Sequence, residues 1–122
     1  MEGLFINHTN HLLCYWSAEQ LNAAKRYGEP VDMGFPEIGA DWDKGKVQEL
    51  AAQMAEKIKE KHPVALLCQG EFTYVHALVC LLQQAGILVL AACSKRVVQE
   101  YVDEQGHTCK KSIFEFVRFR EY

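Results

Sequence analysis

Three short polar runs follow apolar segments of this chain, and their side chains are the best suited to chemistry. The runs are Asn7-His8-Thr9, Gln69-Gly70-Glu71-Phe72-Thr73 and Ser94-Lys95-Arg96. The hydroxyl and two cations of the third run suit an anion such as phosphate. Gly70 would let backbone N–H groups approach a ligand, and a helix that begins near Thr73 would favour negative charge. The sequence therefore predicts a pocket for a phosphorylated small molecule.

Each run also has a purely structural explanation. Thr73 could cap a helix, Gly70 could serve a turn, and residues 94–96 could form a solvated loop. The better-known motifs are absent, because the chain has no G-x-G-x-x-G after its first apolar run, no G-x-x-x-x-G-K-[ST] and no G-x-S-x-G. Dinucleotide, NTPase and α/β-hydrolase chemistry are therefore disfavoured.

The cysteine and histidine residues do not predict a metal site. His8, His11 and Cys14 recur at a spacing of three and could begin a zinc site, but no clear fourth ligand is indicated. Cys68 and Cys93 lie at the ends of predicted strands, where burial is a more frequent role than nucleophilic attack. The five cysteines contain no C-x-x-C pair. We therefore expect no metal, no cofactor and no disulfide framework.

Alternating strands and helices must position the polar runs. The first helix is the best marked, because Ser17 and Gln20 form a capping box and Gly28 follows as a C-terminal cap. The expected strands are residues 3–6, 31–33, 64–68 and 87–93, and the expected helices are residues 18–27, 44–61 and 72–85. Two further β-rich segments, residues 97–102 and 112–120, flank a turn at residues 103–107.

This order of elements predicts an α/β fold. Right-handed crossovers would give a three-layer Rossmann-like parallel sheet in the order 2-1-3-4, with a C-terminal antiparallel hairpin. In that order the crevice lies between the first and third strands. The runs that end these two strands would flank a ligand, and the run at residues 94–96 would border it.

Length and composition limit the class of protein. The 122 residues are 49% hydrophobic and 24% charged, which fits a single domain over residues 1–122 with a substantial core. The formal net charge of -3 argues against duplex nucleic acid as a partner. The chain shows no signal-peptide pattern and no apolar run near the roughly 20 residues of a membrane span. We therefore expect a cytoplasmic protein with no membrane partner.

Three segments resemble a known family. They are Cys68-Gln69-Gly70-Glu71-Phe72-Thr73, Cys93-Ser94-Lys95-Arg96-Val97-Val98 and the closing residues 112–122. They are similar to small stand-alone proteins of type III CRISPR systems with CRISPR-associated Rossmann-fold (CARF-like) domains. Such domains bind cyclic oligoadenylate messengers, and some are ring nucleases. The resemblance covers most of residues 60–122 and the start at residues 4–9.

The resemblance implies an activity and a set of residues. The chain would bind cyclic oligoadenylate, with cyclic tetra-adenylate as the expected ring. It would cleave the ring without metal by attack of a 2′-OH, leaving a 2′,3′-cyclic phosphate and switching off the CRISPR signal. Catalysis would rest on Ser94, Lys95 and Arg96, with His8 as general base. The implied ligand-binding residues are Asn7, Thr9, Gln69, Gly70, Glu71, Phe72 and Thr73.

The same resemblance implies a homodimer, because one small domain presents half a site to a two-fold ligand. The apolar C-terminal hairpin is a possible interface. Tyr15, Trp16 or an aromatic residue of the C-terminal segment could stack on adenine. Two other functions stay open. The protein could be a sensor that binds the messenger without cutting it, or a generic nucleotide-binding domain of the same fold.

Overall fold

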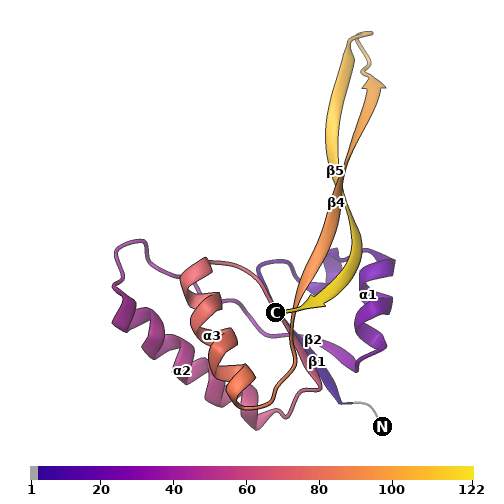
Figure 1. Ribbon diagram of the computed structural model, residues 1–122. Helices are drawn as coiled ribbons and strands as arrows, with labels where there is room; N and C mark the ends of the chain where they lie inside the picture. The colour runs from indigo at the N-terminus through magenta and orange to yellow at the C-terminus, as the bar shows by residue number, and fades with distance from the viewer. Residues whose placement is uncertain (1–2) are drawn as a thin grey trace.

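The computed structural model describes residues 3–122 (Figure 1). In chain order the elements are β1 (Leu4–His8), the 3-10 helix η1 (Leu13–Tyr15), α1 (Ala18–Lys25), β2 (Glu29–Asp32), α2 (Lys44–Glu60), β3 (Ala65–Cys68), α3 (Phe72–Gln84), β4 (Val89–Val102) and β5 (Thr108–Glu121). One five-stranded sheet has the order β2-β1-β3-β4-β5. The β1–β2, β1–β3 and β3–β4 pairs are parallel, and β4 and β5 are antiparallel. The α/β class, the strand order and the C-terminal antiparallel pair are therefore confirmed.

Side chains at the N-termini of α1 and α2 explain where these helices begin. The Ser17 hydroxyl accepts a hydrogen bond from the backbone N–H of Gln20 at 3.2 Å, as the predicted capping box requires. Asp43 caps α2 in the same way, through the N–H of Lys46 at 2.9 Å. Each cap stabilises its helix by about 1 kcal/mol. Within residues 3–122, none of the helices has the length and apolar character needed to cross a membrane.

Two hydrophobic clusters lie on opposite faces of the sheet, because successive side chains of a strand alternate. Ile6 and Leu66 pack with α2 and α3, whereas Phe5 and Leu67 pack with α1 and with Phe119 of β5. In Figure 1, α2 and α3 lie together on one side and α1 on the other. Both faces of β1 and β3 are thus covered, which explains why β3 and the first three residues of β1 are continuous apolar runs in the sequence.

The fourth strand does not end at Cys93, so the predicted boundary of residues 87–93 is wrong, and residues 94–96 lie within the strand rather than after it. β4 continues to Val102 as a strand of 14 residues, and β5 pairs with it over most of its length. The two strands form a ribbon that projects from the body of the molecule (Figure 1). Most side chains beyond Cys93 are exposed, so charged residues fit this strand on either face. The sequence prediction assumed a buried strand, in which a polar run marks the end.

A β-bulge in the ribbon decides which aromatic side chains face α1. Phe119 pairs with Ala92 and Phe116 pairs with Ser94, so β5 contains one more residue than β4 between these two pairs. The two phenylalanines therefore face the same side, although an odd spacing would otherwise put them on opposite faces. Their ring centroids are 4.9 Å apart. The bulge thus brings Phe116 onto the α1 face.

Candidate functional site

A pocket of about 670 Å³ opens where the carboxyl ends of β1 and β3 meet the beginning of the ribbon. We call it the strand-end pocket. Its lining residues are Thr9, Asn10, His11, Tyr15, Trp16, Ser17, Gln20, Leu67, Gln69, Gly70, Ala92, Ser94, Phe114 and Phe116. Each of the three predicted polar runs contributes at least one of them. The pocket lies at the edge of the sheet where α/β proteins bind ligands.

The predicted site residues divide into two groups. Those that line the strand-end pocket are Thr9, Gln69, Gly70 and Ser94. Those that lie outside its lining are Asn7, His8, Glu71, Phe72, Thr73, Lys95 and Arg96. The structure therefore brings together one part of each run and separates the rest.

Asn7 and Thr9 are buried and hold the loop that follows β1. The Asn7 side-chain amide donates to the carbonyl of His11 and to Asp32 Oδ1, both at 2.8 Å. The Thr9 hydroxyl donates to Asn7 Oδ1 at 2.8 Å, and the indole N–H of Trp16 donates to the His11 carbonyl at 3.0 Å. These bonds place His11 and Trp16 at the pocket wall. Asn7 therefore does not line the pocket itself, but it helps to position His11 and Trp16, which do.

His8 is fully buried at the end of β1. Its Nδ1 lies 3.0 Å from the carbonyl oxygen of Met33, and its Nε2 lies 2.8 Å from the hydroxyl of Tyr74. Because a carbonyl only accepts, Nδ1 carries the proton and Nε2 accepts from Tyr74. Burial lowers the pKa of His8, and the bond to Met33 opposes this shift only in part. Neither nitrogen is free for a substrate hydroxyl, so this position does not support the predicted general base.

Gln69 shapes the pocket through its side-chain hydrogen bonds, and Gly70 does so because it lacks a side chain. The Gln69 amide donates to the carbonyl of Ala92 at 3.4 Å and accepts from its N–H at 3.0 Å. The side chain thus continues the ladder beyond the end of β3 at Cys68. Gly70 has a φ of 159°, and a Cβ at this position would run into the ring of Phe35. Only glycine fits here without displacing that ring.

The N-terminus of α3 is occupied by the chain's own carboxylate, contrary to the prediction of an anion site. Glu71 accepts from the Thr73 hydroxyl at 2.5 Å and from the N–H of Tyr74 at 2.8 Å. The bond from Thr73 is the main cause that lowers the pKa of Glu71, followed by the bond from Tyr74. The carboxylate already satisfies the positive end of the helix dipole. Phe72 lies beside it with 88% of its surface exposed.

Alternation along β4 separates the three residues that were predicted to act together. Lys95 lies on the opposite face from Ser94, and its Nζ is 4.0 Å from a carboxylate oxygen of Glu115. Arg96 shares the face of Ser94, and its Nε donates to the Ser112 hydroxyl at 2.9 Å. Ser94 therefore lines the pocket and Arg96 lies beyond it on the same face. Lys95 does not reach the pocket from within one chain.

The pocket walls are aromatic, and the sequence analysis named Tyr15, Trp16 and the C-terminal aromatic residues for stacking but did not bring them into one pocket. Tyr15 and Phe114 are 80% and 70% exposed, and Trp16 and Phe116 are half-buried. His11 is exposed on the same wall. The clustering of aromatic residues in both segments was a weak signal, but nothing local showed that the ribbon returns to the loop after β1. None of the described residues that line the pocket is Lys or Arg.

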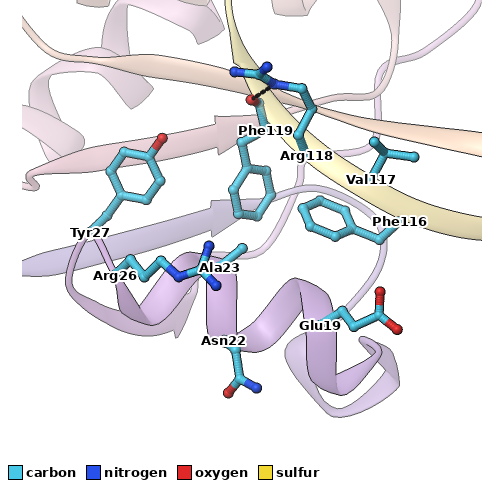
Figure 2. A pocket seen from close by; sticks show the side chains of 9 residues that line it. All are labelled: Glu19, Asn22, Ala23, Arg26, Tyr27, Phe116, Val117, Arg118 and Phe119. Atoms are coloured by element: carbon cyan, nitrogen blue, oxygen red, sulfur yellow. Dashed lines mark hydrogen bonds between the residues drawn. The ribbon is translucent and has the colours of Figure 1, made fainter.

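A second cavity, of about 610 Å³, lies between α1 and β5, and Figure 2 shows its side chains. Arg26 of α1 and Arg118 of β5 line it, and Phe116 is the one residue shared with the strand-end pocket. Arg118 Nε donates to the carbonyl of Phe119 at 3.1 Å, the dashed line in Figure 2. Two guanidinium groups therefore lie beyond Phe116, outside the strand-end pocket.

The described part of the chain contains no group of three or more His, Cys, Asp or Glu side chains that could hold a metal ion. Cys68 is buried, and burial raises the pKa of its thiol to about 12. A thiol that stays protonated at neutral pH is a poor nucleophile. The structure thus favours the structural role of Cys68 over the nucleophilic one.

Comparisons with known proteins identify a family for this chain. No curated protein matches the chain significantly. A family model described as "Uncharacterized protein MJ1673 family" matches residues 3–120. Because this match spans nearly the whole sequence, the chain belongs to the uncharacterized protein MJ1673 family.

Proposed function

We propose that the strand-end pocket binds cyclic oligoadenylate and opens the ring without a metal ion. The observation that carries this proposal is the convergence of exposed aromatic side chains with Ser94 at the carboxyl ends of β1 and β3. Stacking on an aromatic ring is worth about 1–3 kcal/mol per base. In this proposal the domain is a three-layer, Rossmann-like domain of the CARF-like type. It acts in the cytoplasm, in type III CRISPR signalling.

Two walls of the pocket offer rings to adenine. Tyr15 belongs to η1, after β1, and Phe114 belongs to the ribbon, so the two residues come from segments far apart in the sequence. Both are largely exposed, although burial would normally be favourable for rings of this size. A ligand that stacks on them would remove this apolar surface from water. Trp16 is held by its bond to the His11 carbonyl and forms a rigid part of the same wall.

The proposed reaction is an attack of a ribose 2′ oxygen on the adjacent phosphorus. The bond from phosphorus to the 5′ oxygen breaks, and the 5′ oxygen takes up a proton. The product is a linear oligoadenylate with a 2′,3′-cyclic phosphate and a 5′ hydroxyl. In this reaction the exposed His11, rather than the buried His8, accepts the proton of the 2′ hydroxyl as the general base. Ser94 would donate to a phosphate oxygen, and Arg96 would offset charge on the same face.

The test is incubation of the purified protein with cyclic tetra-adenylate in EDTA, followed by chromatography of the nucleotides. We expect linear products that end in cyclic phosphate. The variants His11→Ala and Ser94→Ala should lose at least about 100-fold in rate. Lys95→Ala is the matched control, because Lys95 faces away from the pocket and should keep most activity. Intact ligand with every ring size tried would refute the nuclease.

A second candidate function is a sensor that binds the messenger and leaves it intact. Two observations favour it: no Lys or Arg is among the described residues lining the pocket, and Glu71 occupies the N-terminus of α3. Few groups are then available to stabilise a phosphorane. A sensor would bind the ring tightly and protect it. Equal affinity for ATP or AMP would instead indicate a generic nucleotide-binding domain.

The proposed ligand has rotational symmetry, so two copies of the chain would share one ring. The proposal therefore includes a homodimer. It includes neither duplex nucleic acid nor a membrane as a partner. The formal net charge of the chain is -3, so a site for an anion would occupy only a small part of an otherwise acidic surface.

A further inference from the structure

We infer that two copies of the chain pair through the outer edges of their β5 strands, in antiparallel orientation, with the two-fold axis at Ile113. The pairing would join two sheets into one. It would also bring a lysine of each copy to the strand-end pocket of the other. That second consequence rests on the proposed function, whereas the pairing itself does not.

β5 is a long and open edge strand. It is the last strand in the order β2-β1-β3-β4-β5 and contains 14 residues. Apart from β4, no group in the described residues forms a hydrogen bond with the backbone of residues 108–116. The outward N–H and C=O groups of this stretch are thus available to another strand. An open edge of this length is a template for pairing.

The ribbon needs a partner more than the rest of the sheet does. An isolated two-stranded hairpin is at best marginally stable in water. In Figure 1 the outer part of the β4–β5 ribbon has no helix against it. Large apolar side chains remain exposed along it, including Val98 at 52%, Val102 at 68% and Phe114 at 70%. A second ribbon beside the first would turn two strands into four.

Charge complementarity selects the register of the pair. Residues opposite each other in an antiparallel pair face the same side, so a two-fold axis normal to the sheet passes midway between the two copies of one residue, and the axis is named here after that residue. An axis at Lys111 or Glu115 would place identical charges opposite each other. An axis at Phe114 would bring no opposite charges together, because Lys111 would lie opposite the partner's Val117 at the bulge. The registers at Lys111 and Glu115 are unfavourable because like charges directly opposite are destabilising.

An axis at Ile113 avoids these conflicts. Lys111 then lies opposite the partner's Glu115, and symmetry repeats this pair on the other side of the axis. The two Ile113 side chains meet at the centre. An axis at Ser112 would bring no opposite charges together, and one at Phe116 would fall beside the bulge. Ile113 is therefore the register that the charges favour.

This register also completes the strand-end pocket. On the face that carries Phe114 and Phe116, it places the partner's Lys110 directly opposite Phe116. Both phenylalanines line the pocket, and none of the described residues lining it is Lys or Arg. Each copy would thus provide the cation that the other copy lacks for a phosphate. In the single chain, Lys110 pairs only loosely with Glu100, with Nζ and Oε1 3.8 Å apart and both side chains exposed.

The pairing is tested by the mass of the purified full chain in solution, measured by light scattering without ligand. We expect a dimer for the wild type. Lys111→Glu should raise the dimer Kd at least about tenfold, because it turns two attractive cross-strand pairs into repulsive ones. The double variant Lys111→Glu, Glu115→Lys should restore dimerisation. Lys61→Glu, an equal change of charge at the exposed end of α2, should have no effect.

Two outcomes would overturn the inference. One is a wild type that stays monomeric at high concentration, and the other is a dimer that Lys111→Glu leaves unchanged. Cross-linking gives an independent reading. Ile113→Cys should form a disulfide across the axis under mild oxidation, against the background of the wild type with its five native cysteines. No gain in cross-linked dimer over that background would also count against the register.

The contribution of the lysine is tested separately. Lys110→Ala should leave the dimer intact and weaken binding of cyclic tetra-adenylate at least about fivefold, since one charge-assisted phosphate contact is lost. If the chain dimerises as expected but neither it nor the variant binds the nucleotide, the pairing stands and the proposed function fails. If the wild type binds and Lys110→Ala binds equally well, the shared pocket is wrong.

Discussion

Replacing Tyr74 by Phe removes a single oxygen atom from the core and tests the buried hydrogen bond of His8. Tyr74 and His8 are both fully buried, and the Tyr74 hydroxyl lies 2.8 Å from Nε2. Nδ1 is already committed to the Met33 carbonyl at 3.0 Å. In the variant, Nε2 would keep its lone pair in an apolar site with no donor. No other described side chain forms a hydrogen bond with this nitrogen.

The expected cost follows from that unpaired acceptor. Leaving one buried polar atom unsatisfied costs about 1–3 kcal/mol, and the small cavity adds little because the ring is retained. This is a large part of the roughly 5–15 kcal/mol that stabilises a domain. With a urea dependence of about 1–3 kcal/mol per molar, the midpoint of unfolding should fall by about 1 M.

The assay is urea unfolding at neutral pH, followed by circular dichroism, with the slope of the transition checked for change. Tyr15→Phe is the matched control, because the Tyr15 side chain is largely exposed and its variant should stay within about 0.5 kcal/mol of the wild type. A Tyr74→Phe midpoint that moves no further than that of Tyr15→Phe would refute the assigned network.

Three further predictions concern the same part of the molecule. Burial lowers the pKa of His8 below 6.5, so the unfolded chain binds a proton at His8 more tightly than the folded chain does. The contribution of His8 to the free energy of unfolding should therefore be constant above about pH 6.5 and fall as the pH decreases from there toward the lowered pKa. Urea unfolding at a series of pH values across that range would measure this change. Gly70→Ala should destabilise the fold by about 1–3 kcal/mol in the same assay, because its Cβ would meet an aromatic ring, whereas Gly34→Ala has open space and serves as control. Deleting Val117 removes the extra residue of the bulge but should leave Phe116 opposite Ser94 on the α1 face, so nucleotide binding in a titration should be retained, and a loss of binding with unchanged far-ultraviolet circular dichroism would contradict the assigned bulge.

Local patterns in the sequence were enough to locate most elements of the domain. The apolar run at residues 64–68 predicted a strand because both faces of β3 are buried, and each residue from Ala65 to Cys68 is indeed buried. Ser17 and Gln20 predicted the start of α1 because a capping box is made within one turn. The strand order followed from the alternation of strands and helices, since right-handed crossovers leave few arrangements.

The same local reasoning failed where a residue's role depends on which face it occupies. Lys95 and Arg96 are neighbours in the sequence, yet pairing with β5 puts them on opposite faces of the ribbon. His8 was expected at the mouth of a crevice, but its bonds to Met33 and Tyr74 hold it inside the core. Both outcomes required contacts with residues far along the chain.

The sequence by itself determined that polar runs follow the apolar parts of β1 and β3 at one edge of the sheet, because strand burial and crossover handedness are local or nearly local properties. Its prediction of a third such strand end, at Cys93, was wrong because β4 continues to Val102. Only the tertiary structure decided which members of these runs meet in a pocket. The long ribbon and its bulge return Phe114 and Phe116 to the loop after β1, and this depends on the register between β4 and β5. Register arises from many weak long-range pairs, which no single segment of the sequence encodes.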